Sequence, residues 1–341
     1  MQNHFNIENI RIKSEKILAD HGLTLEDAKI VVDSMLMSDM YGVSTHGIRM
    51  LPSYVQKMDK GEFAYISPKI LKQFTAFTIV DAQNTIGAVS ATYAARIAVR
   101  QAQKSGIHTV FSRNANTFGA GFYYADQIAN AGMIGFVCCN SPAAMPAYNG
   151  LEAMLGTNPL AFAAPTQSYG NIVMDMATSI VSKSKFGVAK AKGERLAEGW
   201  ALDKYGNPTT DPDEGIQGLV LPMAGFKGYE IAMIIDIMSG FLSGASFLND
   251  VGKFYSIDGS CMNVGHMIVA INPEVIYDGN YMQAADHYVE KLKGSKVISS
   301  KNIIIPGDRG KLRKKEAVKN GICLTYDTVK NLESLFGCKL F

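Results

Sequence analysis

The sequence predicts an α/β protein with an N-terminal helical element. From about residue 75 onward, short apolar runs alternate with helical patterns, which is what parallel strand–helix–strand units produce. The first 60 residues show helical patterns only. At 341 residues the chain is long enough for one large core with an appended subdomain, or for two interleaved lobes.

The N-terminal helices have clear start and stop signals. Residues 8–20 carry spaced apolar side chains, and this pattern stops at Gly22. Thr24 fits the N-cap of a second helix, because acidic residues occupy the first turn after it, and Gly42 fits its end. We therefore expect residues 1–65 to form a helical element.

Residues 66–341 are expected to form the α/β core, with the C-terminal helices packing on the N-terminal element. Apolar runs predict strands, and helical patterns fill the gaps between them. The expected strands are 75–81, 107–112, 133–139, 158–165, 171–177 and 266–272, and the expected helices are 91–106, 124–132, 229–243, 281–293 and 326–336. The basic stretch 310–319 is expected to be a solvated loop and helix start.

Composition excludes several classes of protein. No apolar run approaches the roughly 20 residues that span a bilayer, so no membrane association is expected. The polar start of the chain does not resemble a signal peptide, and a net charge of +2 is too small to indicate nucleic-acid binding. Five cysteines, without metal-ligand spacing, fit free thiols in a reducing cytoplasm. We expect no metal site.

Three polar clusters lie where strands or helices end. In the first, residues 44–54, an acid/base group (His46), a guanidinium (Arg49) and a phenol (Tyr54) share one turn between two helices. A helix-capping His46 and a solvated Arg49 are an equally good interpretation of the same residues.

The second cluster joins residues 156–160 to residues 173–179, where an acceptor and hydroxyls at a strand end can hold a ribose, an amide or a phosphate. A helix cap at the strand end is the alternative. The third cluster, residues 223–229, places Lys227 at the start of an apolar helix, where its charge would add to an anion site. An ordinary surface lysine is the alternative here.

The sequence contains no G-x-G-x-x-G after a strand, no G-x-x-x-x-G-K-[ST] and no G-x-S-x-G. An ordinary Rossmann or P-loop nucleotide site is therefore not supported. Taken in order, however, seven segments of the chain resemble the malate/L-lactate dehydrogenase family, which lies outside the Rossmann dehydrogenases and includes ureidoglycolate, sulfolactate and diketogulonate dehydrogenases. The matching segments are STHGIRMLPSY, RNANTFGAG, GTNPLAFAAP, VMDMATS, GWALDKYGNPTTDP, PMAGFKGYE and IIPGD.

The resemblance implies an α/β fold with a mixed, largely parallel sheet of non-Rossmann topology, usually in a homodimer, that binds NAD or NADP. It also implies hydride transfer between the nicotinamide and a small 2-hydroxy or 2-oxo acid. By position, the implied cofactor-binding residues are Ser141, Thr157, Asp175, Met176, Ala177, Lys227, Pro306 and Gly307. The substrate-binding candidates are Arg49, Tyr54, Asn116 and Arg113, and the catalytic candidates are His46 and Thr117.

Two positions depart from the family pattern. Thr117 stands where the family has a histidine regarded as the catalytic acid/base, and Met50 stands where it has an arginine for the substrate carboxylate. A threonine hydroxyl donates a hydrogen bond but exchanges no proton at neutral pH without a partner. His46 as the sole donor, a water held by Thr117 and Asn116, or loss of the ancestral activity would each explain this. A nucleotide-binding protein with altered or lost activity is thus the alternative function.

Overall fold

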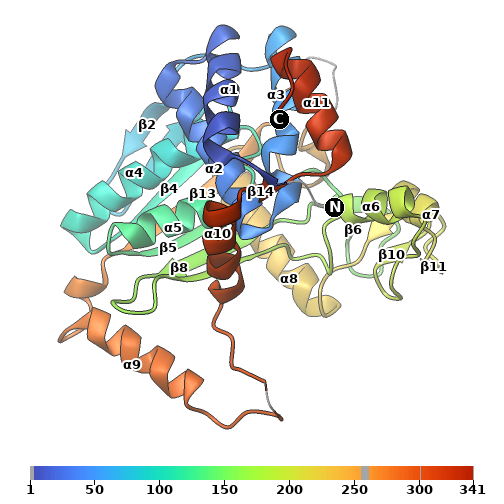
Figure 1. The fold of residues 1–341 in the computed structure, drawn as a ribbon. Coiled ribbons are helices and arrows are strands. Elements are labelled where there is room, and N and C mark those ends of the chain that lie inside the picture. The colour runs from blue at the N-terminus through green and yellow to red at the C-terminus, as the bar shows by residue number, and fades with distance from the viewer. Residues whose placement is uncertain (1–3, 255–260, 300, 341) are drawn as a thin grey trace.

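The computed structural model describes residues 4–254, 261–299 and 301–340 (Figure 1). Its centre is a seven-stranded sheet in the order β2-β3-β4-β13-β5-β8-β9. The strands are β2 (Lys69–Gln73), β3 (Phe77–Asp81), β4 (Ile107–Ala115), β5 (Ile134–Cys139), β8 (Leu160–Ala164), β9 (Ile172–Met176) and β13 (Val264–Ile271). The α/β class, the mixed sheet and the non-Rossmann order are confirmed.

The expectation of a largely parallel sheet is wrong. Only the β3–β4 pair is parallel, and the other five pairs in this sheet are antiparallel. Strand β13 accounts for two of these pairs, because it inserts between β4 and β5 and runs against both, and the pairs β2–β3, β5–β8 and β8–β9 are the other three. The unit β4–helix–β5 does give two strands of the same direction, as its pattern indicates, but they are not neighbours.

Helices cover both faces of this sheet (Figure 1). On one face, α4 (Gly87–Ser105) and α5 (Phe122–Asn130) bury a mostly aliphatic and aromatic core with the strands. On the other face, α8 (Phe226–Ile235) and the π-helical turn η3 (Asp236–Phe241) pack on β5 and β13. The apolar helix expected at 229–243 is therefore α-helical only in its first part.

The N- and C-terminal helices pack together. The core that they share draws side chains from α1 (Ile7–Asp20), α2 (Leu25–Tyr41), α3 (Leu51–Asp59) and α11 (Tyr326–Phe336). Strand β1 (His4–Phe5) pairs with β14 (Ile322–Cys323), and α10 (Asp308–Asn320) packs on α2. The basic stretch 310–319 is thus helical throughout, because α10 gains a partner that its sequence does not reveal.

The caps expected for α2 are confirmed. The Thr24 hydroxyl accepts a hydrogen bond from the Asp27 amide, and Gly42 ends the helix in the left-handed conformation. A domain boundary near residue 65 stays a prediction. None of the described helices is long and apolar enough to cross a membrane.

The remaining elements form a smaller lobe and short connections. They are β6 (Met145–Pro146), β7 (Ala153–Leu155), α6 (Ser184–Lys192), β10 (Ala201–Leu202), β11 (Pro208–Thr209), α7 (Pro212–Gln217), β12 (Leu219–Val220) and α9 (Tyr281–Lys293), with the 3₁₀ turns η1 (Ser44–His46), η2 (Ile48–Met50), η4 (Leu248–Asp250) and η5 (Pro273–Val275). In Figure 1, α9 and the chain that follows it extend away from the sheet.

Candidate active site

One edge of the large sheet collects the polar loops. Strands β3, β4, β5 and β9 all run in one direction, and β8 and β13 run against them. The carboxyl ends of the first four strands and the amino ends of the other two therefore meet at the same edge. The segments at this edge are residues 114–121, 140–141, 157–159 and 175–178, and all four contain predicted site residues.

The turn that carries His46 follows α2. His46 ends η1 and is half-buried, and Arg49 lies in η2 and is exposed. Burial lowers the pKa of His46 below its usual 6.5, and the nearby Arg49 charge lowers it further. His46 is thus neutral at pH 7 and can accept a proton there.

The loop that carries Thr117 approaches this turn directly. A Cβ built on Gly119 would lie 3.9 Å from the Cβ of His46, and Gly119 has a φ of +79°. The first residue of α4, Gly87, is packed so closely that a Cβ there would overlap the carbonyl oxygens of Asn116 and Thr117. The structure therefore brings His46 and the Thr117 loop together.

Side-chain amides fix this loop. Asn116 Nδ2 donates to the backbone oxygens of Asn84 and Thr85, at 3.2 and 3.0 Å, and to Asn84 Oδ1 at 2.9 Å. Asn114 has a φ of +51° and donates to both Asp81 carboxylate oxygens at 3.0 Å. Both asparagines thus tie the loop down. Whether Asn116 also contacts a substrate stays a prediction.

Asp175 lies next to the same loop. Its Oδ2 accepts from the Phe122 amide at 3.0 Å, at the start of α5, and Oδ1 lies 3.7 Å from the position of a Cβ on Gly121. The chain packed around the Asp175 carboxylate reduces its hydration and raises its pKa to about 6, while the residue as a whole keeps contact with solvent. The carboxylate therefore caps a helix, which is the alternative interpretation of the sequence, and it also faces the site.

The segment that holds Ser141 and Thr157 forms a second part of the site. Asn158 Oδ1 accepts from the Ser141 amide at 3.0 Å, and Thr178 Oγ1 donates to the Thr157 carbonyl at 3.0 Å. Within the residues the structure covers, Ser141 Oγ is buried without a hydrogen-bond partner. Since buried hydroxyls are nearly always satisfied, this oxygen is available to a bound molecule.

The other cofactor candidates include Lys227 and the Pro306–Gly307 turn, each at the start of a helix. Lys227 is exposed in the first turn of α8, whose neighbouring Gly228 packs against the Thr178 carbonyl. Pro306 accepts from the Val173 amide at 3.1 Å, and Gly307 precedes α10 with a φ of +95°. Met176 ends β9 and Ala177 follows it, so both lie beside Asp175. Ser141, Thr157, Asp175, Met176 and Ala177 thus lie at the site edge, whereas Pro306 and Gly307 lie beside Val173, near the amino end of β9.

Tyr54 and Arg113 lie differently from the other candidates. The Tyr54 ring is buried in the N-terminal core, 5.8 Å from the Phe63 ring and 5.2 Å from the Phe254 ring. Arg113 points its guanidinium toward Gly244, in the segment after the π-helical turn. Their substrate-binding roles stay predictions.

Several polar residues of the site were not predicted. Asn158 bridges Ser141 to the Ala232 carbonyl of α8, at 3.0 and 2.9 Å, and His266 Nε2 lies 3.1 Å from the Asn116 carbonyl. Asp39 lies under the turn that follows His46. Asn158 stands inside a segment that the sequence had already singled out. Asp39 and His266 come from a helix and a strand that carry no polar motif.

Fold and site together define an α/β enzyme outside the Rossmann class, with a proton-accepting group and helix N-termini at one sheet edge. The family model for malate/L-lactate dehydrogenase matches residues 5–333. The chain therefore belongs to the malate/L-lactate dehydrogenase family, a family of oxidoreductases, as its motifs indicate.

The similarity to individual family members extends over nearly the whole chain. The malate/(S)-sulfolactate dehydrogenase of Methanothermus fervidus is 33% identical over 94% of this chain and 93% of its own. The ureidoglycolate dehydrogenase (NAD(+)) of Escherichia coli O157:H7 is 31% identical over 94% of this chain and 92% of its own. The solved structure of sulfolactate dehydrogenase from Methanocaldococcus jannaschii gives a TM-score of 0.92 at 30% identity, covering 99% of this chain and 98% of that one.

Proposed function

We propose that this chain is an NAD(P)-dependent oxidoreductase that interconverts a small 2-hydroxy acid, malate-like or lactate-like, and its 2-oxo acid by hydride transfer. The single observation that carries this proposal is the approach of the His46 turn to the Thr117 loop beside Asp175. A proton-exchanging group, a guanidinium and a row of hydroxyl and backbone groups are what such a reaction requires.

The residues present fit a dinucleotide. The unpartnered Ser141 hydroxyl, the exposed Lys227 and the Gly307 turn offer a donor, a cation and a helix N-terminus. When bound, the nicotinamide would supply the hydride acceptor or donor. His46 would take the alcohol proton in oxidation and return it in reduction, and Arg49 would bind the carboxylate.

Titration of NADH and NADPH into the purified protein, followed by nicotinamide fluorescence, tests the proposal. A panel of 2-oxo acids and cyclic imino acids is then added to the same samples. We expect binding of one or both nucleotides and oxidation with at least one 2-oxo acid. The absence of binding by both nucleotides would contradict the proposal.

A second candidate function is a nucleotide-binding family member with altered or lost dehydrogenase activity. Thr117 and Met50 favour it, because they replace the expected histidine and arginine. Binding of NADH or NADPH without turnover of any substrate in the panel would support this candidate over the first.

Restoring the missing imidazole separates the two candidates. Thr117→His is expected to raise kcat toward malate or lactate about tenfold or more, because it adds a second proton-exchanging group to the loop whose Gly119 approaches His46. Steady-state kinetics of the parent and the variant measure this change. An unchanged kcat would mean that the pocket has been rebuilt for another substrate.

We also propose a cytoplasmic homodimer. Exposed apolar side chains on α8 and the π-helical turn support the dimer, with Ile234, Ile237 and Phe241 at 55%, 44% and 61% exposure. Such a face favours association with a second copy. Sedimentation velocity is expected to give a dimer for the parent and a monomer for Phe241→Glu. Val318→Glu, on α10, is the matched control and should stay dimeric.

A further inference from the structure

The carboxylate of Asp39 is inserted under the turn between His46 and Arg49. Asp39 lies in the last turn of α2, and its Oδ2 accepts from the Ile48 amide at 2.7 Å. A Cβ built on Gly47 would overlap this same carboxylate, so only glycine fits there. Asp39 thus touches both residues that separate His46 from Arg49.

The Asp39 carboxylate is a hydrogen-bond acceptor for the backbone of this turn. Neither η1 nor η2 has a side-chain cap at its N-terminal residue, and Ile48, whose amide Asp39 holds, is the first residue of η2. The carboxyl is also strongly desolvated. Burial raises its pKa to about 7, although the Ile48 hydrogen bond and the Arg49 charge both lower it.

We propose that Asp39 is a positioning residue, which sets the imidazole of His46 and the guanidinium of Arg49 at the separation that the reaction needs. This inference rests on the proposed function. Asp39 holds the backbone at Gly47 and Ile48, so it acts on His46 and Arg49 through the chain. A displacement of about 1 Å at such a site costs on the order of 100-fold in rate.

Asp39→Ala and Asp39→Asn form the test. The alanine variant removes the acceptor for the Ile48 amide, whereas asparagine keeps an acceptor of nearly the same size without the charge. We expect Asp39→Ala to lower kcat roughly 10- to 100-fold while the Kd for NADH changes less than about twofold. Asp39→Asn is expected to recover kcat to within about threefold of the parent.

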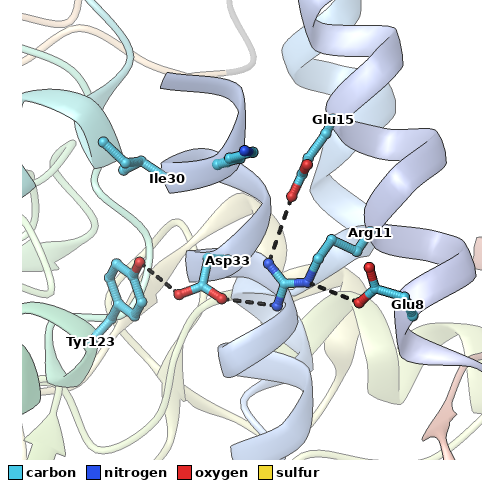
Figure 2. Close-up of a pocket in the computed structure, with 7 residues that line it drawn as sticks. Glu8, Arg11, Glu15, Ile30, Asp33 and Tyr123 are labelled. Carbon is cyan, nitrogen blue, oxygen red and sulfur yellow. Dashed lines mark hydrogen bonds and ion pairs between the residues drawn. The ribbon is translucent and has the colours of Figure 1, made fainter. Parts of the chain in front are cut away.

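Asp33→Ala is the matched control, since Asp33 is a second carboxylate of α2 that anchors the helix elsewhere. Figure 2 shows Asp33 between Arg11 and Tyr123, with Arg11 Nη2 and the Tyr123 hydroxyl each donating at 2.9 Å. Its loss should lower the melting temperature without changing kcat. Equal kcat for Asp39→Ala and the parent, or equal losses for Asp39→Ala and Asp39→Asn, would overturn the inference.

A readout independent of turnover separates this inference from the proposed function. The imidazole Cε1 proton of His46, assigned as the NMR signal missing from His46→Ala, is expected to shift in Asp39→Ala and to stay in place in Asp33→Ala. A parent that binds NADH but turns over no 2-oxo acid overturns the proposed activity alone. A His46 signal unmoved in Asp39→Ala overturns the positioning role.

Discussion

Replacement of His46 by alanine is expected to lower kcat/KM by about two to four orders of magnitude. Thr117 occupies the other candidate position for proton exchange, and its hydroxyl does not titrate near neutral pH. The carbonyl reduction would then proceed without a proton donor for the developing alkoxide. Steady-state kinetics with the best 2-oxo acid, together with thermal unfolding, measure the effect and check the fold.

The role of His46 also predicts how the rates of oxidation and reduction change with pH. Because the pKa of His46 lies below 6.5, its neutral form dominates at pH 7 and accepts the proton of a 2-hydroxy acid. Oxidation is therefore expected to fall as the pH drops through this pKa, and reduction, which uses the protonated form, to rise. In His46→Ala, both of these changes of rate with pH should disappear.

His287→Ala is the control for the histidine substitution, since His287 is exposed on α9. It should leave both rates and both pH profiles unchanged. Turnover by His46→Ala at close to the parental rate would take His46 out of the proton-exchanging role and favour a water held by Thr117 and Asn116.

Gly87→Ala is expected to have the second large effect. The Cβ of the new alanine would overlap the backbone carbonyl oxygens of Asn116 and Thr117. Backbone atoms cannot rotate away from such an overlap as a flexible side chain can. Either α4 or the Thr117 loop must shift. We expect a loss of about 1 to 3 kcal/mol in the free energy of unfolding. A fall of about 100-fold in kcat should accompany it.

Gly187→Ala supplies the contrast. Gly187 lies within α6, is exposed, and has no atom within 4 Å of the position of a Cβ. Its replacement should stabilise the protein by up to about 1 kcal/mol, since alanine favours helix over glycine. Chemical unfolding of both variants gives the two free energies. A stable, active Gly87→Ala would show that the loop does not depend on this close approach.

Local signals in the sequence were enough to predict most of the elements. Thr24 and Gly42 mark the ends of α2, because caps depend on residues that are neighbours in the chain. The position of β13 depends instead on which strands pair across long separations. Its apolar run fits any central strand, so the sequence did not place it between β4 and β5.

The roles of the site residues stay predictions, but the sequence did indicate which segments carry them. His46 and Thr117 lie in loops, and Asp175 lies at the end of β9, in segments of unusual polar composition that the structure brings together. The role of Asp39 was not predicted, because Asp39 lies in a regular helix, where the sequence does not distinguish it from a solvated carboxylate. The structure shows its contact with the next turn through the Ile48 hydrogen bond and the close packing at Gly47.

The insertion of β13 has a consequence for synthesis of the protein on the ribosome. Strands β4 and β5 emerge early, but their shared neighbour begins at Val264. At about 5 to 20 residues per second, the intervening chain takes roughly 6 to 25 s to make. During that interval both strands expose unpaired edges that can pair with other chains. The nascent chain should therefore depend on chaperones most strongly just before residue 264 leaves the exit tunnel.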